Sequence, residues 1–313
     1  MMVGLVAVTG ANGFVGQALC AELVARGGTV RRLVRVIGAS LDVVAVGEIS
    51  RETDWEAALT GVDAVVHLAA RVHMMADTSA DPLAEFRRVN VEGTLNLARQ
   101  AAAAGVRRFV FVSSIKVNGE STLPGRAFAA DDPPDPQDPY GISKYEAEQG
   151  LRNVAGQTGM EVVIIRPPLV YGPGVKANFL AMVQWLARGI PLPLGAIHNK
   201  RSLVALDNLV DLITTCLDHP AAANQTFLAG DGEDLSTTEL LQRVALALGK
   251  PARLIPVPAG VLQWSASLLG KKAMMQRLCG SLQVDIGKAG NVLGWTPPVT
   301  VDEGLHRAVA DIR

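Results

Sequence analysis

Tyr140 and Lys144 are four residues apart and could together move a proton. On a helix both side chains would emerge on one face, because residues i and i+4 are neighbours there. A phenol has a pKa of about 10 and exchanges its proton poorly at neutral pH. A neighbouring ammonium favours the phenolate, so we expect Lys144 to lower the pKa of Tyr140 into the range of a general acid or base.

A serine hydroxyl is placed to hold the oxygen atom at which this proton is exchanged. The segment 106–113 has the apolar, β-branched content of a buried strand, and Ser113 and Ser114 stand at its end. We expect Ser114 rather than Ser113 to be in register for this task. The predicted catalytic residues are therefore Ser114, Tyr140 and Lys144.

Three evenly spaced glycines, Gly10, Gly13 and Gly16, separate the apolar segment 5–8 from an apolar-periodic helix. Glycine permits the positive φ of a sharp turn and the close approach of a ligand to the backbone. A helix N-terminus behind such a turn offers unpaired N–H groups and a positive dipole end to a pyrophosphate. The stretch predicts a dinucleotide site at the first turn of a doubly wound sheet, although its middle glycine comes one residue later than in G-x-G-x-x-G.

Apolar strands alternate with amphipathic helices through the first half of the chain. This order predicts an α/β fold with a Rossmann-type, doubly wound parallel sheet and a smaller C-terminal substrate domain. We expect residues 1–167 to form the dinucleotide-binding domain, with 201–219 returning to its sheet. Residues 168–200 and 220–313 would form the substrate domain. The proline-rich loop 131–139 is too stiff for a helix interior and leads into the helix that begins at Tyr140.

Composition excludes several classes of protein. Of 313 residues, 49% are hydrophobic and 19% charged, and the net charge of −1 gives no general affinity for nucleic acid or an anionic membrane. The three distant cysteines predict neither a disulfide framework nor a zinc site, and the histidines have no metal-ligand spacing. No apolar run approaches the roughly 18 residues of a membrane span, and no signal peptide is expected. We expect a cytoplasmic protein without a metal.

The residue after the second predicted strand, 29–34, bears on the choice of cofactor. Dinucleotide folds that bind NAD place an acidic side chain there, about 20 residues past the glycines, to hold the ribose 2′-hydroxyl. Here the position carries Arg35, with Arg32 nearby, and a basic side chain suits a 2′-phosphate. We therefore expect NADP(H) to be preferred, with NAD(H) possible.

The TGxxGxxG turn, the strand that ends in serine and the Tyr-x-x-x-Lys pair occur in this order. Together they resemble the extended short-chain dehydrogenase/reductase superfamily over residues 3–174. Arg166-Pro167 and the following Val170–Gly174 are similar to the RPxxVYGPG run of its NAD-dependent epimerase/dehydratase group, which acts on nucleotide sugars. The resemblance also implies a homodimer through the helices at 91–104 and 140–156.

The resemblance and the glycine turn imply a set of cofactor contacts around the predicted carboxyl edge of the sheet. With Arg35, they are Gly10, Asn12, Gly13, Phe14, Val15, Gly16, Glu48, Ile49, Leu68, Ala69, Ala70, Asn90, Tyr140, Lys144 and Pro167. The resemblance further implies that Asn178, Arg201 and Arg277 bind the diphosphate of a UDP-sugar, with Ser114 at the sugar. Arginine forks and an amide are suited to bidentate contacts with a diphosphate.

One departure from the family pattern narrows the range of expected reactions. Nucleotide-sugar 4,6-dehydratases carry an Asp-Glu pair where this chain has Ile115 and Lys116, so we expect no dehydration and expect Lys116 to be solvated. SSIKVNGE resembles bacterial enzymes of surface-polysaccharide synthesis. We expect reduction of the C4 keto group of a UDP-4-keto-6-deoxy-N-acetylhexosamine.

Two alternatives remain open. The first is a UDP-hexose 4-epimerase, which would return the hydride to the sugar and retain its NAD. The second is a non-catalytic NADP-binding sensor or scaffold. Such proteins commonly lose the pair that this chain keeps at Tyr140 and Lys144.

Overall fold

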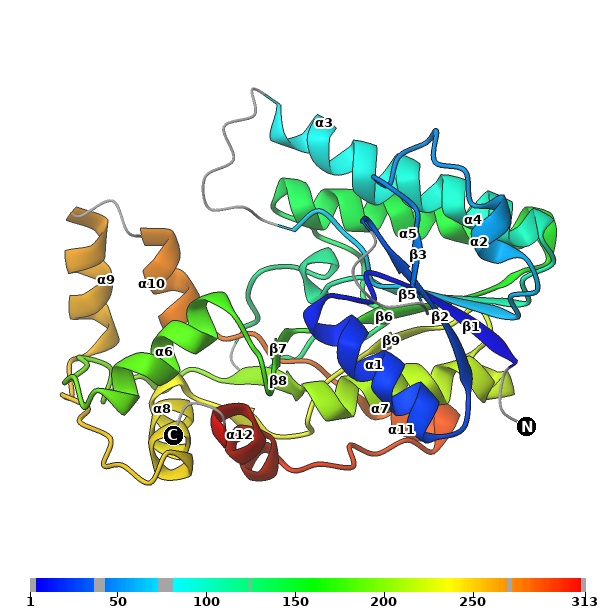
Figure 1. The fold of residues 1–313 in the computed structure, drawn as a ribbon. Coiled ribbons are helices and arrows are strands. Elements are labelled where there is room, and N and C mark those ends of the chain that lie inside the picture. The colour runs from blue at the N-terminus through cyan, green and yellow to red at the C-terminus, as the bar shows by residue number, and fades with distance from the viewer. Residues whose placement is uncertain (1–3, 37–42, 73–80, 124, 269–271, 311–313) are drawn as a thin grey trace.

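The computed structural model describes residues 4–36, 43–72, 81–123, 125–268 and 272–310 (Figure 1). Within these ranges, only the backbone is described at 177–178, 265–268, 272–274 and 277. The chain forms a large parallel sheet between two helix layers, and a smaller sheet with its own helices lies to one side (Figure 1).

The large sheet has seven parallel strands in the spatial order β3-β2-β1-β4-β5-β6-β9. The strands are β1 (Leu5–Thr9), β2 (Thr29–Val34), β3 (Val43–Ala45), β4 (Ala64–His67), β5 (Arg108–Val112), β6 (Glu161–Arg166) and β9 (Thr226–Leu228). From β1 the chain proceeds outward to β3 and then returns to β4 on the other side. The crevice between β1 and β4 is therefore the topological switch point, where ligands of such sheets bind. This arrangement confirms the Rossmann-type fold.

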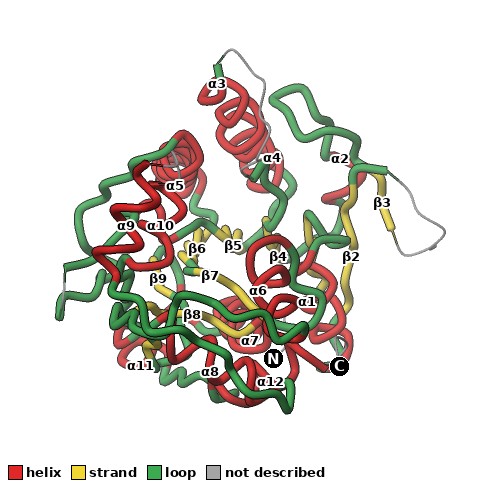
Figure 2. Tube along the Cα trace, turned by 90° about the vertical axis from the view of Figure 1, so that its left-hand side faces the viewer, coloured by secondary structure: helices red, strands yellow, loops and turns green. Residues whose placement is uncertain are grey.

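Each face of the sheet is covered by a separate helix layer with its own apolar core. One layer contains α1 (Phe14–Ala25), α7 (Leu206–Asp218) and α11 (Gly287–Leu293). The other contains α2 (Glu56–Leu59), α4 (Thr94–Ala103) and α5 (Pro139–Thr158). In Figure 2 the strands lie between α4 and α5 above and α7 below. Near-continuous apolar strands such as β4, buried along its whole length, are expected where helices cover both faces.

The segment 82–103 is helical throughout but changes its winding. It runs from α3 (Pro82–Phe86) through a π-helical stretch, η1 (Arg87–Gly93), into α4. Asn90 lies in the π-helical stretch, a type of irregularity that is frequent at functional sites.

The smaller sheet has the order β10-β8-β7 and lies beside the carboxyl end of the large sheet. Its strands are β7 (Leu169–Tyr171), β8 (Arg201–Ala205) and β10 (Asp234–Leu235), and β10 is antiparallel to β8. Helices α6 (Ala177–Ala187), α8 (Thr237–Ala247) and α12 (Val301–Val309) share a core with it. Beyond them, α9 (Ala259–Leu268) packs against α10 (Lys272–Cys279) at the edge of the molecule (Figure 1).

The strands between 169 and 228 are arranged differently from the sequence-based expectation. β8, expected to return to the large sheet, pairs with β7 instead. It is β9 that joins the large sheet, beside β6. Short apolar strands of three to five residues do not specify their partners by sequence alone, so only the packing decided between the two sheets. The proposed domain boundaries stay predictions.

Among the described helices, none is both long enough and apolar enough to cross a membrane.

Candidate active site

The glycine turn after β1 packs tightly against the segment that follows β4. Gly10 has a φ of +66°, and a Cβ there would lie 3.0 Å from the amide nitrogen of Ala69. A Cβ on Gly16 would lie 2.1 Å from the carbonyl oxygen of Gly10. Gly13 is the N-cap of α1 and has no side chain to bond the first-turn N–H groups. The turn therefore offers a close backbone approach and open N–H donors, which fit the pyrophosphate of a dinucleotide.

Thr9 and His67 hold the two sides of this crevice together. The Thr9 hydroxyl oxygen accepts hydrogen bonds from the amides of Leu68 and Ala69, both at 3.2 Å, and lies 2.7 Å from Nδ1 of His67. Nε2 of His67 lies 3.0 Å from the hydroxyl of Thr94. Burial, and then the charge of Lys144, lower the pKa of His67 to about 3. His67 is thus a neutral structural residue within the packing of the strands.

The structure brings Ser114 and Tyr140 together across two elements. Ser114 follows β5, and Tyr140 lies in the first turn of α5, where Asp138 is the N-cap and accepts a 2.7 Å hydrogen bond from the amide of Gly141. Burial and the negative charge of Asp138 raise the pKa of the Tyr140 phenol to about 12, against the lowering effect of its hydrogen bond with Ser114. The pKa of Tyr140 is therefore above its usual value, not below it as the spacing of Tyr140 and Lys144 predicted. In this site the phenol therefore loses its proton less readily than an ordinary tyrosine does.

Lys144 lies one helical turn after Tyr140 and is buried. Its Nζ donates a 2.9 Å hydrogen bond to the carbonyl oxygen of Val112 and lies 4.4 Å from the ring centroid of Phe111. Burial lowers the pKa of Lys144 to about 7, while the carboxylate of Glu148 acts in the opposite direction. The amine of Lys144 is thus held at the end of β5, the strand that Ser114 follows.

Ser113 has a different partner from Ser114. Its hydroxyl donates a 2.6 Å hydrogen bond to Glu148, which also binds the buried Arg166 through two bonds of 2.9 and 2.6 Å. The hydroxyl of Ser113 is therefore engaged in a buried ion-pair cluster. Of the two serines, Ser114 is the one that contacts Tyr140.

The remaining cofactor candidates lie near the same edge of the sheet, but two of them have structural partners. The side chain of the buried Asn90 bonds both the amide and the carbonyl of Arg71, at 2.8 and 3.0 Å, and the hydroxyl of Ser143 at 3.0 Å. Ile49 packs so closely on η1 that a Cβ on Gly93 would lie 2.6 Å from it. Asn90 thus joins the segment after β4 to α5, and its contact with a cofactor stays a prediction.

Of the basic residues along β2, Arg35 is the one that stays exposed past the end of the strand. Arg31 donates to the carbonyl oxygens of Ala58 and Thr60, and Arg32 hydrogen-bonds Cys20. Glu48 is also exposed, and its carboxylate lies 3.8 Å from Arg88.

Arg201 and α10 lie side by side although they are far apart in sequence. Nη1 of Arg201 donates a 3.1 Å hydrogen bond to the carbonyl of Gly280, directly after the helix that carries Arg277. Asn178 lies in the first turn of α6. The side chains of Asn178 and Arg277 are outside the described part of the structure, so their contacts with a diphosphate stay predictions.

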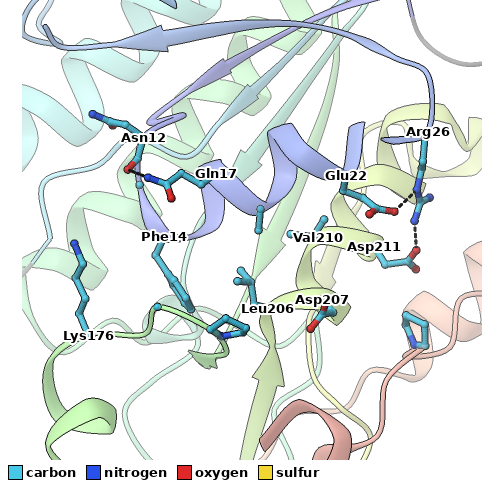
Figure 3. Close-up of a pocket in the computed structure, with 15 residues that line it drawn as sticks. Asn12, Phe14, Gln17, Glu22, Arg26, Lys176, Leu206, Asp207, Val210 and Asp211 are labelled. Carbon is cyan, nitrogen blue, oxygen red and sulfur yellow. Dashed lines mark hydrogen bonds and ion pairs between the residues drawn. The ribbon is translucent and has the colours of Figure 1, made fainter. Parts of the chain in front are cut away.

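A groove of about 550 Å³ runs between α1 and α7 and reaches the glycine turn at Asn12, Gly13 and Phe14 (Figure 3). Toward its other end, Arg26 binds Glu22 and Asp211, both at 2.6 Å. Neither Ser114, Tyr140 nor Lys144 lines it. The groove therefore flanks the glycine turn and is separate from the site of proton transfer.

Three contributors to this site were missed from the sequence: Thr9, Asp138 and Glu148. Asp138 had a readable signal, because Asp before proline at a helix start is typical of an N-cap. Thr9 opens the TGxxGxxG motif, but its partner lies 58 residues away, and the partner of Glu148 lies 35 residues away. Neither role can be read from the local sequence.

Comparison with known proteins adds an independent finding. Residues 6–230 match the NAD dependent epimerase/dehydratase family. A Vibrio cholerae protein named UDP-glucose 4-epimerase is 50% identical over 304 residues, which cover 96% of this chain and 93% of that protein. An Escherichia coli protein named N-acetyl-alpha-D-glucosaminyl-diphospho-ditrans,octacis-undecaprenol 4-epimerase is 28% identical, with 97% and 94% covered.

Among solved structures, a short-chain dehydrogenase/reductase superfamily protein from Agrobacterium tumefaciens, crystallised with bound NAD, superposes with a TM-score of 0.76. It is 26% identical, and the match covers 99% of this chain and 97% of that one. The similarity thus extends over both sheets and is not confined to the glycine turn.

Proposed function

Because the chain belongs to the NAD dependent epimerase/dehydratase family, we propose that it is a UDP-hexose 4-epimerase that retains its nicotinamide dinucleotide. Membership of the family confirms the resemblance to extended short-chain dehydrogenases/reductases. Two relatives named as 4-epimerases, one of them 50% identical, support this reading over the 4-keto reductase that we expected first.

The observation that carries the proposal is the contact between Tyr140 and Ser114 at the carboxyl end of β5. The glycine turn lies at the same edge, two strands away. A dinucleotide held at the glycine turn would supply first the acceptor and then the donor of the hydride exchanged at the sugar C4. For the oxidative half, Tyr140 would first have to be ionised to the phenolate. It would then take the proton of the C4 hydroxyl and give it back in the second half. Ser114 would hold the same oxygen by a hydrogen bond.

The choice between NAD and NADP has support on both sides. The family name and the NAD-bound neighbour favour NAD. The exposed Arg35 favours NADP, because its guanidinium is available to a 2′-phosphate. The preference for NADP(H) therefore stays a prediction, with Arg35 as its determinant.

A 4-keto reductase is the second candidate, and Arg35 is the specific observation in its favour, since a reductase consumes NADPH in each turnover. Dehydration has weaker support, because Lys116 stands where the dehydratases carry an acid. The homodimer through 91–104 and 140–156 and the cytoplasmic location also stay predictions.

The test is incubation of the purified protein with UDP-glucose, and separately with UDP-N-acetylglucosamine, in the presence of NAD⁺. Proton NMR of the sugar would show the C4 epimer in each reaction that occurs. Tyr140→Phe is the matched inactive control. Failure to interconvert either pair, together with stoichiometric oxidation of NADPH by a UDP-4-keto-6-deoxy sugar, would replace the epimerase with the reductase. Release of a 4-keto-6-deoxy product from a UDP-hexose would overturn both readings.

A further inference from the structure

Lys116, expected to be solvated, is ion-paired with two carboxylates. Its Nζ lies 2.9 Å from Oε1 of Glu120 and is also bound by Oδ2 of Asp138. Lys116 lies in η2 (Ile115–Val117), the short 3₁₀ turn that follows Ser114. Asp138 lies outside this turn, as the N-cap of the helix that carries Tyr140. The ion pair with Asp138 therefore joins the two segments that carry Ser114 and Tyr140.

The two oxygens of the Asp138 carboxylate serve different elements. Oδ1 accepts the amide proton of Gly141 within α5, and Oδ2 binds Lys116 of η2. The backbones are also in close contact, since a Cβ on Gly141 would lie 2.9 Å from the carbonyl oxygen of Lys116. The amide of Lys116 donates a 3.3 Å hydrogen bond to the Ser114 hydroxyl. One carboxylate thus caps the catalytic helix and ties it to the turn beside Ser114.

We propose that Lys116 and Asp138 are positioning residues, which hold Ser114 against Tyr140 and set the electrostatic field at the phenol. That Lys116 and Asp138 assist proton transfer rests on the proposed function. The ion pair between them and its effect on the pKa of the Tyr140 phenol do not. The proposal gives a role to Lys116, which stands where related dehydratases carry an acid.

Several charged groups lie on Tyr140's own helix and on the elements packed against it. Asp138 caps α5 and Lys144 lies within it, and Lys116 and Glu120 belong to the segment after β5. From the segment after β4, Arg71 lies over the ring of Phe86, whose centroid is 6.0 Å from that of Tyr140. Asp138 disfavours the phenolate, and the ammonium of Lys116 offsets that charge. Removing the cation of Lys116 and removing the anion of Asp138 should therefore shift the pKa of Tyr140 in opposite directions.

The test measures the phenol directly, in full-length protein labelled with 3-fluorotyrosine, whose hydroxyl is more acidic than that of tyrosine. The chain has three tyrosines, and Tyr140→Phe identifies the fluorine resonance of Tyr140. We expect Lys116→Met to raise the titration midpoint of this resonance, and Asp138→Asn to lower it, each by about one pH unit. Asparagine is as good an N-cap as aspartate, so Asp138→Asn keeps the start of α5. Lys116→Arg should restore the original midpoint.

Lys288→Met is the matched control, because its 2.7 Å ion pair with Asp131 does not involve the N-cap of α5. It should leave the midpoint unchanged. Should Lys116→Met not fold, Lys116→Gln supplies the same measurement. Midpoints that do not move, or that move in the same direction in both variants, would overturn the proposal. If the midpoints shift in opposite directions but the protein epimerises no UDP-hexose, the proposed link between Lys116, Asp138 and Tyr140 stands. Only the proposed function is then rejected.

Discussion

Nζ of Lys144 donates a 2.9 Å hydrogen bond to the carbonyl oxygen of Val112, the last residue of β5. This bond ties α5 to the strand end two residues before Ser114. It places a buried amine whose pKa is about 7 beside the candidate catalytic phenol. The charge of Lys144 therefore changes near pH 7.

Lys144 should make stability depend on pH. Its pKa falls from 10.5 to about 7 on folding, so between these values the unfolded chain binds a proton that the folded chain does not. Stability contributed by this group must then rise with pH from about 7 upward. Denaturant unfolding at pH 7 and pH 9 should show this rise in the wild type and a smaller one in Lys144→Met. Equal pH slopes in the two proteins would contradict the buried, partly neutral amine.

Tyr140→Phe should lower turnover by ~10²–10⁴, the usual contribution of a positioned general acid or base. The substitution removes one oxygen, so folding and cofactor binding should stay nearly unchanged. Ser114→Ala should lower turnover less, since Tyr140 still holds the sugar oxygen, and Ser113→Ala serves as the neighbouring comparison. Single-turnover hydride transfer with saturating sugar and cofactor is the measurement. Near-normal transfer in Tyr140→Phe would mean that another group moves the proton.

Arg35→Asp should weaken the binding of NADP(H) and spare NAD(H). A charge-assisted hydrogen bond to the 2′-phosphate contributes about 1–3 kcal/mol, less where the group is as exposed as Arg35. Calorimetric titration of both dinucleotides into wild type and variant measures the difference. Arg31→Met is a suitable control, because the Arg31 guanidinium is engaged with two backbone carbonyl oxygens. Tighter binding of NAD(H) to the wild type would show that Arg35 does not select the cofactor.

Gly16→Ala should disrupt the glycine turn, because its Cβ would lie 2.1 Å from the Gly10 carbonyl and 2.8 Å from the Cα of Ala11. Both neighbours are backbone atoms and cannot rotate away. We expect dinucleotide binding to fall at least tenfold, with a loss of stability of about 1–3 kcal/mol from overpacking. Gly156→Ala in α5 is the control, since a Cβ there would meet nothing within 4 Å, and it should be neutral or stabilising. Fluorescence titration with the dinucleotide and denaturant unfolding measure the two effects.

The order of elements and the candidate chemistry could be predicted from the sequence because their signals are local. The strand at 29–34 was predicted with its observed bounds, and the glycine turn lies at the switch point of the sheet as expected. Ser114, Tyr140 and Lys144 were recognised by type and spacing, and the fold brings them to one place. Turn glycines, the apolar period of a strand and the i, i+4 spacing of a helix are readable within a few residues.

Only the tertiary structure decided which sheet β8 and β9 join, what Lys116 does and how the phenol of Tyr140 titrates. Each depends on groups distant in sequence: Lys116 is paired with Asp138, 22 residues away, and Ser113 with Glu148, 35 residues away. Spacing alone suggested that Lys144 lowers the pKa of Tyr140, yet burial and Asp138 raise it. Burial and long-range charge are properties of the packed molecule. A pattern of residue types therefore predicts which residues belong to a site but not their protonation states.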